Sequence, residues 1–117
     1  MVFSSKNTNL KHDLIIQING ITLDVVTTTK FLGVVIDDQL KWKDHIAYIS
    51  KKVAKATGII SIACRVFDKH TLKQLYYSFV YPYLIFGNIV WGKSDDVTIW
   101  PIFRLQKKII RMINNVN

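Results

Sequence analysis

The chain has 117 residues, which suffice for one modest hydrophobic core but not for a second, so it is one small domain or a piece of a larger protein. Half of its residues are hydrophobic, which excludes a disordered chain. Lysine and arginine number 16 against 8 acidic residues, and the formal net charge of +8 suits a polyanionic partner, with nucleic acid first and an anionic membrane surface second.

The N-terminal half is expected to form β-structure. Asn19-Gly20 stands between two apolar runs, and this dipeptide is the strongest short hairpin signal because a type I′ turn needs positive φ at both positions. A further strand contains Gly33, which indicates a bulge or the close approach of another backbone. The sequence thus predicts strands near residues 1–5, 14–18, 21–26 and 30–36.

The hydrophobic period changes from two to about 3.6 after this region, which predicts helices. Pro82 should end the second helix, because proline disfavours the helical conformation of the preceding residue and lacks an amide donor. Asp95, Asp96 and Thr98 are candidate caps of the last helix, and Pro101 favours Thr98, since proline is tolerated in a first turn. The three helices are expected at 42–65, 69–80 and 99–113. The predicted fold class is therefore α+β, a small antiparallel β-sheet with an Asn-Gly hairpin followed by a helical bundle.

The uncharged stretch 76–91 is shorter than the ~20 residues that a membrane-spanning helix needs. We expect it to be a buried core segment, with PYLIFGNIVWG deeply buried and Trp42 and Tyr81 in the core. No membrane partner is expected. A single cysteine, Cys64, and charged residues early in the chain indicate an intracellular protein, nuclear or cytoplasmic, that is not secreted.

Asp37-Asp38 lies where the last predicted strand gives way to the first helix. Adjacent carboxylates can hold divalent cations, but a two-metal site needs carboxylates that converge from at least two elements. Asp13 and Asp24, the other acids of this region, are expected at strand ends. We therefore expect turn chemistry, in which Asp38 or a near neighbour accepts hydrogen bonds from amides of the first helical turn. No catalytic residue and no metal ligand is assigned.

Two predicted helices carry clusters of basic residues. The last helix separates a basic face, within about 100° of arc, from an apolar face that includes Ile109 and Ile113. Such a stripe is either a solvated surface or a set of phosphate contacts. In the second alternative, the two clusters flank one groove. The basic residues are Lys51, Lys52 and Lys55 on the first helix, and Arg104, Lys107, Lys108 and Arg111 on the last.

Five segments in order, TKFLGVVID, LKWKDHI, LYYSFVYPYL, IVWG and LQKKIIRMI, resemble the stretch after the catalytic motifs of reverse transcriptases from jockey-like, LINE-type non-LTR retrotransposons. The similarity covers nearly the whole chain. It implies that residues 1–40 correspond to the end of the palm with the primer grip, and residues 41–117 to the thumb. The family's catalytic aspartate pair lies upstream of the strand that MVFS resembles, so the resemblance places it outside this chain.

The resemblance implies that the chain grips a template-primer duplex, such as an RNA–DNA hybrid, through its backbone and beside the remaining fingers and palm. Lys30 and the Phe31-Leu32-Gly33 turn resemble the primer grip, in which an aromatic packs beneath a close backbone approach. Magnesium would serve the parent polymerase, and no cofactor is expected in this chain, which should be inactive alone. Two alternatives stay open: a free-standing basic nucleic-acid-binding protein, and a protein-interaction module that docks through 76–91.

Overall fold

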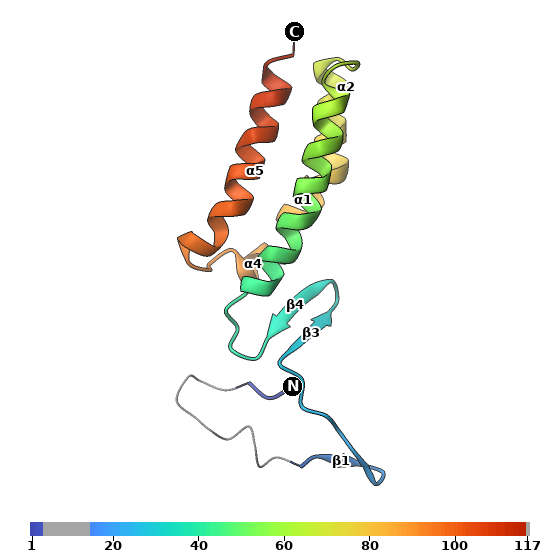
Figure 1. The fold of residues 1–117 in the computed structure, drawn as a ribbon, viewed down its shortest axis with the longest axis vertical. Helices are drawn as coiled ribbons and strands as arrows, with labels where there is room; N and C mark the ends of the chain where they lie inside the picture. Colours follow the sequence, from blue (N-terminus) through green and yellow to red (C-terminus); the bar gives the residue numbers. More distant parts are fainter. Residues whose placement is uncertain (4–14, 117) are drawn as a thin grey trace. The chain divides into compact units, whose positions relative to one another are not determined.

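The computed structural model describes residues 1–3 and 15–116, which fall into two compact units, Met1–Asp44 and His45–Asn117 (Figure 1). The described residues contain two antiparallel two-stranded sheets and five helices. The predicted α+β class is therefore confirmed. Residues 1–3 form no strand, contrary to the prediction for the start of the chain, and residues 4 and 5 lie outside the described residues.

The Asn-Gly hairpin is present. Strand β1 (Gln17–Ile18) pairs with β2 (Ile21–Thr22), and Asn19 (φ 50°) and Gly20 (φ 79°) both adopt the left-handed conformation that a type I′ turn requires. The strands have two residues each, shorter than predicted; residue 14 of the first predicted strand lies outside the described residues. All side chains from 15 to 33 are exposed, so no buried face extends the pairing.

The strand predicted at 30–36 is instead a second hairpin. Strand β3 (Thr28–Phe31) pairs with β4 (Val34–Asp37), and Leu32 (φ 47°) and Gly33 (φ 85°) form the two-residue turn between them. The single-strand interpretation is wrong because two consecutive positive-φ residues reverse the chain. Gly33 adopts this conformation without steric cost, whereas Leu32 gives no sequence signal of it.

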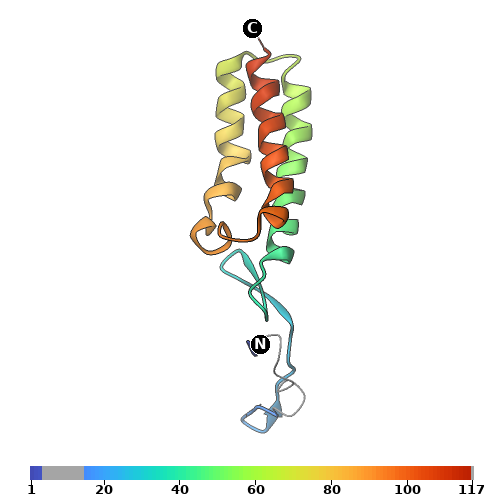
Figure 2. The same cartoon turned by 90° about the vertical axis from the view of Figure 1, so that its left-hand side faces the viewer.

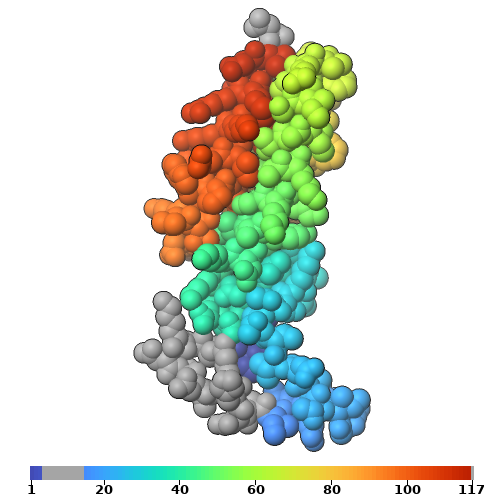
Figure 3. Space-filling view, in the orientation of Figure 1, coloured from blue at the N-terminus to red at the C-terminus, as the bar shows by residue number. Residues whose placement is uncertain are grey.

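The helical unit contains three longer helices joined by short connections. Helices α1 and α5 run in the same direction beside each other, and α2 runs back along them (Figures 1 and 2). In the space-filling view, α1 and α5 share one face of the unit (Figure 3). Helix α1 spans Lys43–Ala63, α2 Lys69–Phe79, α3 Tyr81–Ile85, α4 Asn88–Trp91 and α5 Asp96–Asn114.

The hydrophobic core of this unit comes from side chains that recur every three or four residues along the helices. Gln106 of α5 also donates a hydrogen bond from Nε2 to the Tyr76 hydroxyl of α2, at 3.0 Å. Helix α1 itself matches the predicted helix at 42–65 to within two residues at each end. The core side chains are Ile46, Ile49, Val53, Ala56, Ile60 and Ala63 of α1, Leu72, Val80, Trp91, and Ile102, Ile109 and Ile113 of α5.

Helix α2 begins where the sequence predicts. The carboxylate of Asp68 accepts hydrogen bonds from the amides of His70 and Thr71, both at 3.3 Å, and so caps the first turn. The helix ends at Phe79, and Pro82 stands in the first turn of α3, where its missing amide costs no helical hydrogen bond.

Helix α5 starts earlier than predicted. The amides of Thr98 and Ile99 already donate to the Asp95 carbonyl, at 2.9 and 3.1 Å, so Asp95 is the cap residue rather than Thr98. Pro101 consequently lies inside the helix, where it removes one hydrogen bond at a cost of ~3 kcal/mol. The packing of Ile102, Ile109 and Ile113 overrides this local preference.

The segment 82–92 is not deeply buried, and that prediction is wrong. It folds into α3 and α4, with Gly87 (φ 66°) between them, and Trp91 alone of these eleven residues, all described, is buried. A helix of one turn can direct few side chains inward, so the others face outward. Tyr81 is likewise exposed, and Trp42 is half-buried.

Candidate nucleic-acid interface

The net charge of the chain comes from one of its two units. Met1–Asp44 contains five lysines and five aspartates and is formally neutral. His45–Asn117 contains eleven lysines and arginines and three aspartates, and so carries the whole net charge of +8. An attraction for polyanions therefore belongs to the helical unit.

Helix α5 presents a cationic stripe, which we define as Arg104, Lys107, Lys108 and Arg111. All four side chains are exposed. At 100° per residue they lie within about 100° of arc, so they share one face of the helix, while Ile102, Ile109 and Ile113 are buried on the other. The structure thus brings together all four residues predicted on this helix.

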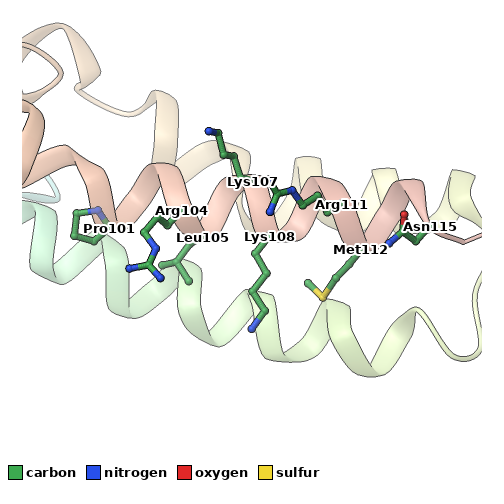
Figure 4. A pocket seen from close by; sticks show the side chains of 8 residues that line it. All are labelled: Pro101, Arg104, Leu105, Lys107, Lys108, Arg111, Met112 and Asn115. Carbon is green, nitrogen blue, oxygen red and sulfur yellow. The ribbon is translucent and has the colours of Figure 1, made fainter.

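A groove of about 750 Å³ runs along the cationic stripe. Lys108, Leu105 and Met112 point from α5 toward the neighbouring α1, whereas Lys107 points away from it (Figure 4). Apolar side chains and long cationic ones therefore alternate along one surface, which suits the sugar-phosphate backbone of a nucleic acid. The lining residues are Pro101, Arg104, Leu105, Lys107, Lys108, Arg111, Met112 and Asn115.

The three clustered lysines of α1 are not all exposed. Lys51 and Lys55 are exposed and, at 100° per residue, lie opposite the buried side of α1. Lys52 is half-buried, and its Nζ lies 5.6 Å from the centroid of the Tyr48 ring. This cation–π distance gives Lys52 a partner within its own helix. Lys51 and Lys55 are the members of this cluster that face solvent.

Two exposed aromatic residues border the cationic stripe, and the sequence analysis missed them. Trp100 is 53% exposed and Phe103 is 40% exposed, with ring centroids 5.7 Å apart. Lys107 places its Nζ 4.2 Å from the Phe103 centroid and 5.9 Å from that of Trp100. The spacing of residues 100, 103 and 107 on one helix was the available signal, because such residues are neighbours on a helix surface.

The primer-grip candidates lie in the other unit. Lys30 and Phe31 end β3, and Leu32 and Gly33 form the turn to β4. Phe31 and Leu32 are largely exposed, so Phe31 does not pack beneath the turn as the resemblance implies. Gly33 closes the turn with φ 85°.

The Asp37 carboxylate binds backbone amides of the turn that follows it. Its Oδ1 accepts hydrogen bonds from the amides of Gln39 and Lys41, both at 3.0 Å, and its Oδ2 accepts one from Trp42 at 2.8 Å. Burial raises the pKa of Asp37, but these three amides outweigh it and leave the pKa below its usual value. Turn chemistry is confirmed, although the bonded amides precede α1 instead of belonging to its first turn.

No group of three histidine, cysteine or acidic side chains suited to a metal ion occurs in residues 1–3 and 15–116. Over the same residues, no helix combines the length and apolarity needed to cross a membrane. Comparison of the chain with protein-family models, with curated proteins and with solved structures found no match.

Proposed function

We propose that the helical unit binds nucleic acid through the sugar-phosphate backbone, as the thumb-like part of a retrotransposon-type reverse transcriptase that grips a template-primer duplex. The observation that carries this proposal is the cationic stripe, four exposed cations on one face of α5 that line a groove. The unit that contains them holds the entire net charge of the chain.

The dimensions of the stripe fit this role. Seven residues separate Arg104 from Arg111, which is ~10 Å along a helix axis. A duplex carries about one negative charge per 1.7 Å of its axis, so ~6 phosphate charges fall within that length. Four phosphate contacts give a slope of about −3.6 in log affinity against log salt. Affinity should therefore fall by about 10² between 50 and 200 mM salt. Contacts of this kind fix position without reading sequence.

The catalytic part of such an enzyme belongs to other segments. RNA-directed DNA synthesis would use magnesium and deoxynucleotides held by the palm, with the fingers completing the nucleotide site. We assign Lys30 and the Phe31-Leu32-Gly33 turn to the primer grip, where an exposed tight turn presents backbone to the primer. The isolated chain should show no template-directed nucleotide incorporation.

Fluorescence anisotropy of a labelled RNA–DNA hybrid over a salt series tests the proposal. Charge reversal at Lys107, Lys108 and Arg111 should reduce the salt slope by ~2.7, the share of three contacts. The matched control reverses Arg65, Lys73 and Lys93, which are exposed in the same unit but lie outside α5. Equal weakening by both variants, or failure of the folded chain to bind, overturns the proposal.

A second candidate is protein docking through residues 76–91. Tyr77 is 60% exposed and Ile89 is 85% exposed, and the Tyr77 ring lies 5.3 Å from that of Tyr81. Contiguous exposed apolar side chains of this kind are typical of an interaction surface. Self-association that is insensitive to salt and is abolished by Tyr77→Ser and Ile89→Ser would favour docking.

A further inference from the structure

We propose that Trp100 and Phe103 form a stacking platform for an unpaired nucleobase, so that the chain prefers a duplex from which a single strand emerges. The inference rests on the proposed function, because the cationic stripe is taken to hold the backbone. It adds to that function a contact for an unpaired base beside the duplex, made by side chains outside the cationic stripe.

The two rings are available to a ligand. Trp100 and Phe103 are 53% and 40% exposed. Lys107 covers Phe103 from 4.2 Å. Trp100 also lines an apolar depression of about 330 Å³ together with Asp96 and Val97. The indole is thus the open member of the pair.

The position of the rings indicates what the ligand is. At 100° per residue, Trp100 lies within ~60° of arc from Arg104, Lys107 and Arg111, so aromatic and cationic side chains form one continuous row along α5. Proteins that bind single strands combine the same two elements, a cationic track for phosphates and aromatic rings for bases. A strand whose phosphates contact Arg104 and Lys107 brings its bases to Trp100.

Whether a base is paired determines whether it can stack on Trp100. Within a duplex each base is already stacked on its neighbours, and a side chain must pay to displace it. An unpaired base at the end of a duplex exposes its face at no such cost. Stacking on an aromatic ring contributes ~1–3 kcal/mol per base, equivalent to a preference of about 5- to 150-fold.

The test compares a blunt RNA–DNA hybrid with the same hybrid carrying a single-stranded overhang of about four nucleotides that contains 2-aminopurine. We expect tighter binding of the overhang substrate and a change in 2-aminopurine fluorescence. Trp100→Ala should remove both effects. Trp100→Phe should keep part of the preference. Tyr77→Ala, which truncates an exposed aromatic outside α5, is the matched control and should change neither.

The possible outcomes separate this inference from the proposed function. If the chain binds blunt hybrid with its normal salt dependence but shows no preference for the overhang, only the stacking platform is overturned. If neither substrate is bound, the proposed function fails as well. Vesicles containing phosphatidylserine are the third probe, because exposed tryptophan beside lysine also suits a lipid surface. Vesicle binding that depends on Trp100, without an overhang preference, overturns the platform in favour of an anionic membrane.

Discussion

The imidazole of His45 meets the indole of Trp91 edge-on, with ring centroids 5.8 Å apart and an interplanar angle of 63°. This contact joins the start of α1 to α4, and His45 is only 2% exposed. The Trp91 Nε1 donates to the Phe86 carbonyl at 2.9 Å, which fixes the indole in place. The pair therefore anchors the segment 82–92, most of which is otherwise exposed.

Stability should depend on pH through His45. Burial lowers its pKa below the usual 6.5, so the unfolded chain binds the proton more readily than the folded one. The free energy of unfolding should therefore be highest above pH 6.5 and should decline as pH falls below that value. Urea unfolding at pH 7.5 and pH 5, compared with the His45→Gln variant, measures this. A wild-type decline no steeper than that of the variant contradicts the prediction.

Asp37→Ala should destabilise the β3–β4 hairpin. The change leaves the amides of Gln39, Lys41 and Trp42 without their acceptor, and each lost hydrogen bond is worth ~1 kcal/mol. Because the pKa of Asp37 is lowered, the contribution is present above pH 3.8 and is lost as pH falls below that value. Hydrogen exchange of the amides in β4 reports the effect. Asp24→Ala, at an exposed position, is the control and should leave their exchange unchanged.

Tyr76→Phe should weaken the packing of α2 against α5. The variant deletes the hydroxyl that accepts the Gln106 hydrogen bond, a loss of ~1 kcal/mol. For a unit of this size the melting temperature should fall by ~4–8 °C. Tyr77→Phe removes a hydroxyl from an exposed side chain and should be neutral, so equal shifts from the two variants would refute the role of this bond.

Two glycines should respond oppositely to alanine. Gly58 lies within α1, and a Cβ there meets nothing within 4 Å, so Gly58→Ala should stabilise the helix by ~1 kcal/mol. At Gly92 a Cβ would be forced into the Asn88 carbonyl oxygen, so Gly92→Ala should destabilise. Thermal unfolding of both variants provides the comparison. Stabilisation by Gly92→Ala, or loss of stability in Gly58→Ala, would contradict the geometry.

Local signals in the sequence predicted the elements whose chemistry is local. Asn19-Gly20 specifies its own turn, Asp68 caps its own helix, and the period of α1 identifies its buried side. The errors arose where tertiary packing decides. Pro101 is carried inside α5 by the burial of neighbouring isoleucines, and no local rule predicts the left-handed conformation of Leu32.

The candidate site divides in the same way. Helical periodicity sufficed to bring Arg104, Lys107, Lys108 and Arg111 onto one face, because three- and four-residue spacing is a property of the helix itself. The residues that line the groove likewise all belong to α5 or are its C-cap residue, Asn115. Trp100 was missed because a tryptophan in an amphipathic helix is ordinarily assigned to the core.

The confinement of the net charge to His45–Asn117 would also affect the kinetics with which a polyanion associates. At physiological ionic strength the Debye length is ~8 Å, close to the ~10 Å between Arg104 and Arg111 along the helix axis. If the proposed function holds, an approaching strand would interact with these cations as one extended charge. Its association should then be fast and sensitive to salt, while its dissociation rate should depend on how well its phosphates match the side chains.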